Sequence, residues 1–68
     1  METEKIIEIL NAMEDSKWYL YEMFERDGEP EKAQESYGEY IAIWTVRRML
    51  EEPEYAAIMR EIYFKEDN

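Results

Sequence analysis

The four residues Asp27-Gly28-Glu29-Pro30 separate two long stretches whose apolar residues recur at helical spacing. Gly28 can adopt the left-handed backbone conformation that closes a helix, because it has no Cβ atom to clash. Pro30 suits the first position of a helix, where a backbone N–H has no intrahelical partner to lose. A connection this short predicts that the two helices fold back on each other as an antiparallel hairpin.

The residues before this connection predict a first helix over about residues 4–26. Thr3 is the expected N-cap, because its hydroxyl can accept a hydrogen bond from a free N–H of the first turn. Lys17 interrupts the apolar face of this helix. The members of that face are spaced three, four or seven positions apart, and they are Ile6, Leu10, Met13, Leu20 and Phe24.

The second helix is expected over about residues 30–51. Its middle, residues 40–46, carries no charge, and such a stretch predicts a helix that is enclosed on several sides. Gly38 and Ala42 lie four positions apart on one face, which predicts the close approach of another helix there.

Pro53 predicts the start of a third, shorter helix over about residues 53–65 that packs across the hairpin. Its apolar face has five members, which are Tyr55, Ile58, Met59, Ile62 and Tyr63. We therefore predict an all-α fold in which residues 1–68 form a single small, acidic, three-helix domain.

The composition limits both the core and the partners of this domain. The chain has 68 residues, no cysteine and a net charge of −10. A domain of this size has a thin core, and without cysteine it depends on well-packed helices or on self-association. The negative charge disfavours direct binding to nucleic acid or to an anionic membrane and favours a cationic partner. Because neither a membrane-spanning stretch nor a secretory signal pattern is present, we expect a cytoplasmic protein.

The residue types needed for most catalytic sites are missing. The chain contains neither histidine nor cysteine, which excludes the usual nucleophilic triads and the common zinc sites. It also has no glycine-rich phosphate loop and no calcium-loop pattern. We therefore expect a non-catalytic protein without a metal or another cofactor.

One enzymatic pattern remains as a third hypothesis. Glu22-x-x-Glu25 is similar to the spacing with which all-helical nucleotide pyrophosphohydrolases hold Mg²⁺. The second carboxylate pair that such an enzyme needs has two candidates, which are Glu35 with Glu39 and Glu51 with Glu54. In a chain with 15 glutamates this spacing also arises by chance, and solvated surface carboxylates are the favoured interpretation.

Negative charge is concentrated in the first part of the chain, where residues 1–39 carry 12 acidic and 4 basic side chains. Some acids have a basic residue one turn away, as Glu22 has in Arg26. Two rows follow helix faces and are our candidate partner-binding residues, namely Glu8, Asp15 and Glu22 on the first helix and Glu31, Glu35 and Glu39 on the second. The rows fit a basic protein surface or imitate a nucleic-acid backbone. A solvated face that only aids solubility is the competing interpretation.

Aromatic residues make up 15% of the chain, which is a large share for a three-helix core. We expect some of them, among Trp18, Tyr19, Tyr21 and Tyr37, to lie at the rim of the core or on a binding surface. The basic doublet Arg47 and Arg48 is followed four residues later by Glu51 and Glu52, which predicts local ion pairs rather than DNA binding.

The leading hypothesis is an acidic helical binding protein that docks on a basic protein surface and inhibits or modulates it. Small acidic proteins of phages and mobile elements offer a class-level analogy, as nucleic-acid mimics or as inhibitors of host defence or transcription. The alternative is a structural homo-oligomer, such as a homodimer, that associates through its aromatic surface and points its acidic faces to water.

Overall fold

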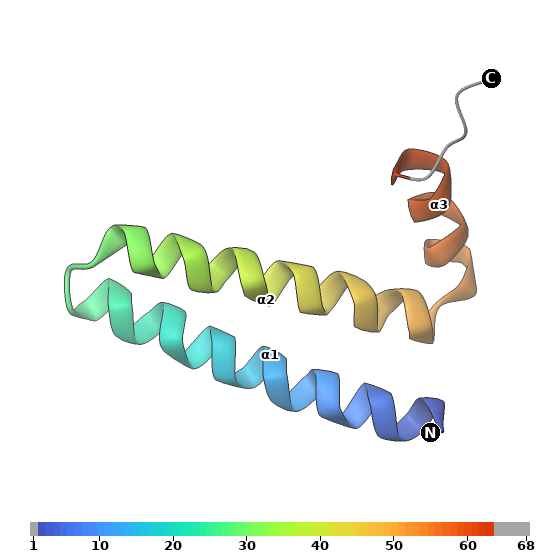
Figure 1. Ribbon diagram of the computed structural model, residues 1–68, viewed down its shortest axis with the longest axis horizontal. Helices are drawn as coiled ribbons and strands as arrows, with labels where there is room; N and C mark the ends of the chain where they lie inside the picture. Colours follow the sequence, from blue (N-terminus) through green and yellow to red (C-terminus); the bar gives the residue numbers. More distant parts are fainter. Residues whose placement is uncertain (1, 64–68) are drawn as a thin grey trace.

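The computed structural model of the chain, which describes residues 2–63, consists of three α-helices (Figure 1). Helix α1 covers Thr3–Arg26, α2 covers Pro30–Glu51 and α3 covers Pro53–Tyr63. α1 and α2 lie side by side as an antiparallel hairpin, and α3 turns away from the open end of the hairpin. Within the described residues α3 packs on α2 and does not reach α1. The predicted all-α architecture is confirmed.

The connection between α1 and α2 has the backbone conformation that its sequence predicts. Gly28 has a φ of 71° and donates its N–H to the carbonyl oxygen of Glu25 at 3.2 Å. Glu29 donates to the carbonyl oxygen of Phe24 at 2.9 Å, so the carbonyls of Phe24 and Glu25 in the last turn of α1 are satisfied. Pro30 is the first residue of α2. The reversal of chain direction between α1 and α2 therefore follows from the backbone preferences of residues 27–30.

The two outer helix ends differ slightly from expectation. Thr3 is not the N-cap of α1: it is the first helical residue, and Glu2 precedes it without a side-chain capping bond. Glu4 lies in the first turn, where its negative charge interacts favourably with the partial positive charge of the helix N-terminus. α3 is described as far as Tyr63, so the last part of the predicted third helix lies outside the described residues.

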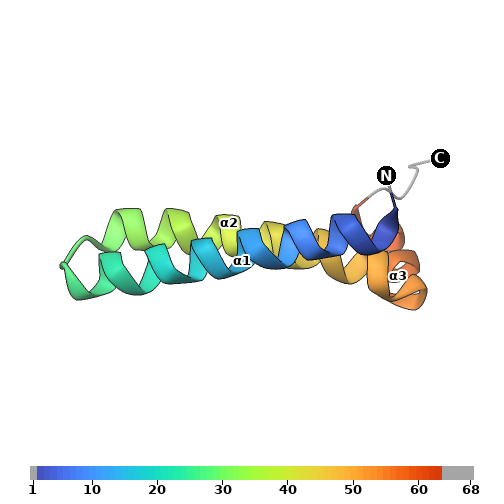
Figure 2. The same ribbon diagram turned by 90° about the horizontal axis from the view of Figure 1, so that it is seen from below.

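The molecule is a single layer of helices. Its extents are 45 × 33 × 16 Å, and the view along the layer shows a flat strip (Figure 2). A helix with its side chains is about 10–12 Å across, so the shortest extent leaves room for one layer only. Within the described residues no large side chain is fully buried, and Ala33 is the buried apolar residue of the seam between α1 and α2.

The prediction that residues 40–46 are enclosed on several sides is wrong. Ile41 and Val46 are exposed, and Ala42 is exposed as well. Gly38 does not mark a close helix approach, because a Cβ atom built there would meet nothing within 4 Å. The physical reason is the single layer: residues 40–46 have α1 on one side and the first turn of α3 beside Trp44, and the rest of the stretch faces solvent.

A charge pair joins the two long helices inside this seam. The Glu14 side chain is buried, and both of its carboxylate oxygens accept hydrogen bonds from the guanidinium of Arg47, one of them at 3.2 Å from Nη2. Arg47 also donates to Glu51 at 2.6 Å, one turn along α2. The hydrogen bond to Glu14 raises the pKa of Arg47 above its ordinary value.

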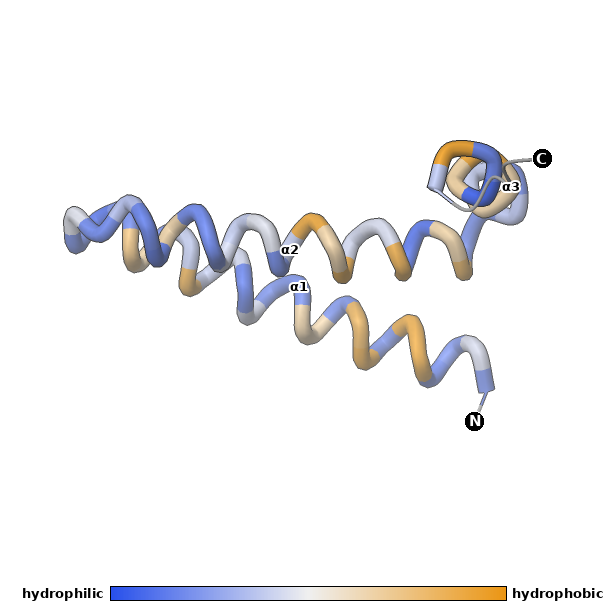
Figure 3. Tube along the Cα trace, turned by 45° about the horizontal axis from the view of Figure 1, so that its top comes forward, coloured by the Kyte–Doolittle hydropathy of each residue, from blue (hydrophilic) through white to orange (hydrophobic). Residues whose placement is uncertain are grey.

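The two halves of the hairpin differ in chemistry (Figure 3). Near the turn the helices meet through a ring cluster with centroids 5.2 to 6.5 Å apart, formed by Trp18, Tyr21, Tyr37 and Tyr40. The strongly hydrophobic positions lie mostly toward the open end and on α3. None of the described helices is both long enough and apolar enough to cross a membrane.

Helix α3 is anchored at its first turn. The Tyr55 ring meets the Trp44 ring edge-on at 6.2 Å, and the Arg48 guanidinium lies 4.6 Å from the former and 5.0 Å from the latter. Further along α3, Ile58 and Ile62 are more than half exposed. The predicted apolar face of α3 is therefore only partly covered: Tyr55 and Met59 are half-buried, whereas its other members are exposed.

Candidate functional site

An exposed group of acidic and aromatic side chains lies on one side of the hairpin, near the turn. It consists of Asp15, Trp18, Tyr19 and Glu22 of α1 with Tyr37 of α2, and we call it the acid–aromatic face. Trp18 and Tyr19 follow Asp15 by three and four residues and precede Glu22 by four and three, a spacing that places all four on one helix surface. Trp18 and Tyr19 are 40% and 60% exposed, so both rings can contact a partner.

The two carboxylates of this face are available to external cations. The predicted local pair of Glu22 with Arg26 does not form, and none of the ion pairs within residues 2–63 involves Asp15 or Glu22. Trp18 is held by its neighbours, because its ring centroid lies 6.5 Å from that of Tyr37. The face thus offers free negative charge beside a preorganised aromatic surface.

The structure places the six predicted partner-binding residues on the surface but separates the two rows. On α1, Glu14 and Tyr21 lie along the seam. Each residue of an α-helix is rotated by about 100° from the one before it. Lys17 and Trp18 therefore lie on opposite sides of the seam. Glu8, Asp15 and Glu22 are exposed on the side of Trp18.

The row on α2 follows the other side of the hairpin. Glu31, Glu35 and Glu39 are exposed, and Glu39 forms an ion pair with Lys17 at 2.9 Å across the two helices. Because Tyr37 packs toward Trp18 while Glu39 reaches Lys17, the α2 row and the acid–aromatic face point in different directions. A single flat partner surface therefore cannot cover both rows at once.

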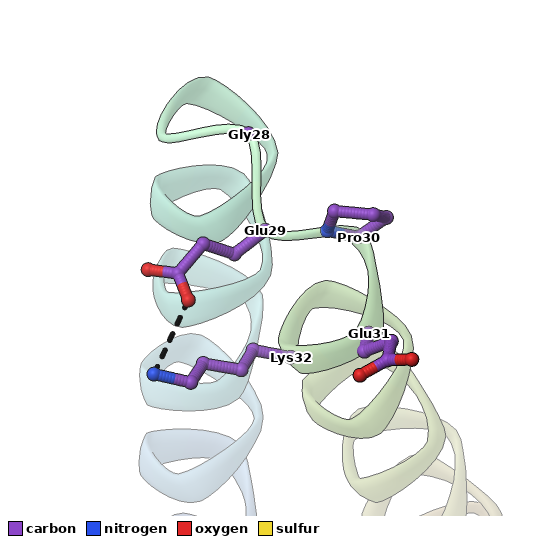
Figure 4. A pocket seen from close by; sticks show the side chains of 5 residues that line it. All are labelled: Gly28, Glu29, Pro30, Glu31 and Lys32. Carbon is purple, nitrogen blue, oxygen red and sulfur yellow. Dashed lines mark ion pairs between the residues drawn. The ribbon is translucent and has the colours of Figure 1, made fainter.

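The hollow at the turn offers a ligand few groups to bind. It has a volume of about 300 Å³ and is lined by residues 28–32 (Figure 4). The Lys32 ammonium is already bound to the Glu29 carboxylate at 3.2 Å, and the Glu31 carboxylate points the other way. No two charged groups converge on the hollow, so it offers a ligand nothing to hold it in place.

The carboxylate pairs of the hydrolase hypothesis are not brought together. Among the described residues no three acidic side chains lie close enough to share a metal ion. Of the candidates for the second pair, Glu39 is bound to Lys17 and Glu51 to Arg47. The geometry therefore gives this hypothesis no support.

Comparison with known proteins adds no relative from which a function could be taken. No protein-family model matches the chain, and no curated protein and no solved structure is similar enough to count as a match. The function must therefore be argued from the faces of the molecule itself.

Sequence reasoning identified the acids and the exposed aromatics separately but did not join them. The signal was present in the interval from Asp15 to Glu22, where two aromatic residues fall within one turn of both carboxylates. What the sequence did not contain was the contribution of Tyr37, because α2 comes alongside Trp18 only in the folded hairpin.

Proposed function

We propose that this chain is a non-catalytic, acidic binding protein that docks on a Lys/Arg-rich protein surface and thereby inhibits or modulates its partner. The observation that carries the proposal is the acid–aromatic face, in which unpaired Asp15 and Glu22 carboxylates flank exposed Trp18 and Tyr19 rings. Arg and Lys side chains bind carboxylates through charge-assisted hydrogen bonds and bind aromatic faces through cation–π contacts.

The two components of the face have separate roles in this binding. The carboxylates and the net charge of −10 accelerate and orient the encounter with a cationic surface. The aromatic rings supply the contact area, because Trp and Tyr bury much surface at a small entropy cost and dominate binding hot spots. A partner with exposed arginines is favoured over one with lysines alone, since a guanidinium can stack on a ring and bind a carboxylate at once.

Mimicry of nucleic acid is the narrower form of this proposal. On α1 the acids Glu8, Asp15 and Glu22 are seven residues apart, which corresponds to about 10 Å between charges along the helix. A DNA strand carries a charge about every 3.4 Å, so this row is a dilute copy of a phosphate backbone. The acid–aromatic face fits the broader proposal better, in which carboxylates and aromatic rings together bind a basic protein surface.

Self-association through the aromatic surface, the alternative from the sequence, is less well supported. Trp18, Tyr21, Tyr37 and Tyr40 already pack against one another within the hairpin. Two copies that met at this face would bring Asp15 and Glu22 against the same carboxylates of the other copy, which is electrostatically unfavourable.

Capture with matched variants tests the proposal. The tagged chain is exposed to lysate of its source organism, bound proteins are eluted in steps of rising salt, and each step is identified by mass spectrometry. We expect a basic protein in stoichiometric amount at moderate salt, because screening weakens exposed charge pairs. The combined variant Asp15→Asn and Glu22→Gln is expected to bind this protein at least about tenfold more weakly.

The matched control is Glu31→Gln with Glu35→Gln, which removes the same charge from the other row. We expect that control to retain the partner, and Tyr19→Ala to lose it, since Tyr19 is exposed and makes no ring contact within the described residues. Equal loss in both charge variants would show that only net charge matters. Capture of no partner by the unchanged chain at any salt step would remove the proposal.

A further inference from the structure

A row of apolar side chains follows α2 on the side of the hairpin that carries the acid–aromatic face. Tyr37, Ile41 and Trp44 are four and three positions apart, so they lie on one surface of the helix, and we call them the α2 apolar row. Tyr37 and Ile41 are 39% and 38% exposed, and the Tyr37 ring lies 6.5 Å from that of Trp18. The row therefore continues the aromatic part of the face toward the open end of the hairpin (Figure 1).

The acid row of α1 runs along the same side. Glu8, Asp15 and Glu22 are exposed and seven positions apart, so they extend over about 21 Å of the helix. Lys5 and Arg26 lie within one turn of the ends of this row. None of the ion pairs within residues 2–63 involves either of them or any of the three acids. The acid row is therefore open to basic side chains of a partner.

One end of the α2 apolar row already packs against a helix. The Trp44 ring meets Tyr55 in the first turn of α3 edge-on at 6.2 Å. α3 cannot turn back along the rest of the row, because Glu52 is the one residue between α2 and α3 and an antiparallel reversal takes about 2–5 residues. Tyr37 and Ile41 therefore stay open to a helix from another molecule.

The charge on this side decides which molecule supplies that helix. A second copy of the chain would bring a further net charge of −10 against the acid row. Arg48 offers no compensating charge, because its guanidinium is bound to Glu52 at 3.1 Å. A helix with arginines or lysines beside an apolar stripe satisfies both rows, since charged groups meet carboxylates while apolar groups meet apolar groups.

We propose that the partner contacts this side of the hairpin through a basic amphipathic helix, which lies along α1 and α2 and completes a three-helix bundle. This inference rests on the proposed function and specifies the kind of basic surface that the acid–aromatic face binds. Apolar residues of the partner helix, at intervals of three and four, pack on the α2 apolar row. Basic residues on the flank toward α1, at intervals of seven, meet the acids of the same spacing.

The acid row also sets the length of the partner helix. A span of about 21 Å corresponds to about four helical turns, so a segment of about 15–18 residues covers it. A helix of that length is only marginally stable alone in water. We therefore expect the partner segment to gain helix when it binds.

Titration of the full chain with two synthetic peptides tests the proposal. Both contain about 18 residues with the same numbers of leucine, arginine and alanine. One has leucines at intervals of three and four with arginines beside that stripe, and the other has the same residues in scrambled order. We expect the patterned peptide to bind at least about tenfold more tightly in calorimetry and to add helix in difference circular dichroism. Equal affinities, or binding of neither peptide, would overturn the proposal.

Two matched variants locate the contact. Ile41→Ala shortens the α2 apolar row, whereas Val46→Ala shortens a 49% exposed aliphatic residue about 140° away around the same helix. We expect Ile41→Ala to weaken binding of the patterned peptide at least about fivefold, because apolar contact area is lost, and Val46→Ala to leave it unchanged. Equal losses in the two variants, or no loss in Ile41→Ala, would show that the helix does not lie on this side.

The peptide titration and the capture experiment together separate the two proposals. Capture of a basic protein with equal binding of the two peptides would keep the proposed function and overturn the helical docking mode. Preference for the patterned peptide without a captured partner would support the docking mode and remove the proposed function.

Discussion

Among the described residues, Glu14 is the charged residue that is buried. It is 6% exposed, and each of its two carboxylate oxygens accepts a hydrogen bond from Arg47. We expect Glu14→Gln to lower the free energy of unfolding by about 1–3 kcal/mol, because it weakens a charge-assisted pair and leaves donors of Arg47 poorly satisfied. Chemical denaturation monitored by circular dichroism measures this change.

Glu51→Gln is the control, since Glu51 binds the same guanidinium but is about one third exposed. We expect it to cost less than about 1 kcal/mol, as partly solvated pairs usually do. If the two substitutions cost the same, the burial of Glu14 would have no energetic consequence.

Whether the sequence predicts an ion pair depends on how far apart its two residues lie along the chain. The pairs of Arg47 with Glu51 and Arg48 with Glu52 are one helical turn apart, and both predictions are confirmed. The partner of Arg47 in the seam is 33 residues away and is one of many glutamates, so no local pattern singles it out. Lys17 was likewise expected only as an interruption of an apolar face, whereas it closes an ion pair with Glu39.

At the scale of helices and turns, the two glycines should respond in opposite directions to the same substitution. Gly28 has a φ of 71°, so Gly28→Ala forces an L residue into the left-handed region and should lower the stability by about 1 kcal/mol. Gly38 lies inside α2 with no atom within 4 Å of an added Cβ. Gly38→Ala should therefore raise the stability by about 0.5–1 kcal/mol.

Thermal unfolding of both variants beside the unchanged chain measures the two shifts under one set of conditions. A destabilising Gly38→Ala would show that something packs against this part of α2 in solution. That result would restore the close helix approach that the sequence led us to expect.

The helix boundaries were largely predictable because local chemistry sets them. Gly28, Pro30 and Pro53 define the ends by their own backbone preferences, and the structure confirms each position. The surroundings of residues 40–46 were not predictable in this way. An uncharged stretch shows that a helix face is apolar, but whether another helix covers that face depends on how many layers the chain forms.

For the whole molecule, the sequence predicts the hairpin but not which surfaces lie on the same side. The six predicted acids form two rows at regular spacing, and only the folded hairpin shows that these rows point in different directions. The rotation of α1 and α2 against each other depends on many weak contacts in the seam, among them the aromatic cluster near the turn. No residue spacing within one helix contains that information.

The proposed complex with a basic partner should respond strongly to salt, and this prediction concerns the whole molecule. The chain carries a net charge of −10, so its attraction to a cationic surface extends beyond the residues in contact. Raising the salt concentration from about 0.05 M to about 0.5 M shortens the Debye length from about 14 Å to about 4 Å. The complex should then weaken at least about tenfold, because its charge pairs are exposed. Calorimetric titration of the captured partner at the two salt concentrations measures this change. An affinity that did not change would show that the aromatic rings alone hold the partner and that the carboxylates of the acid–aromatic face have no part in binding.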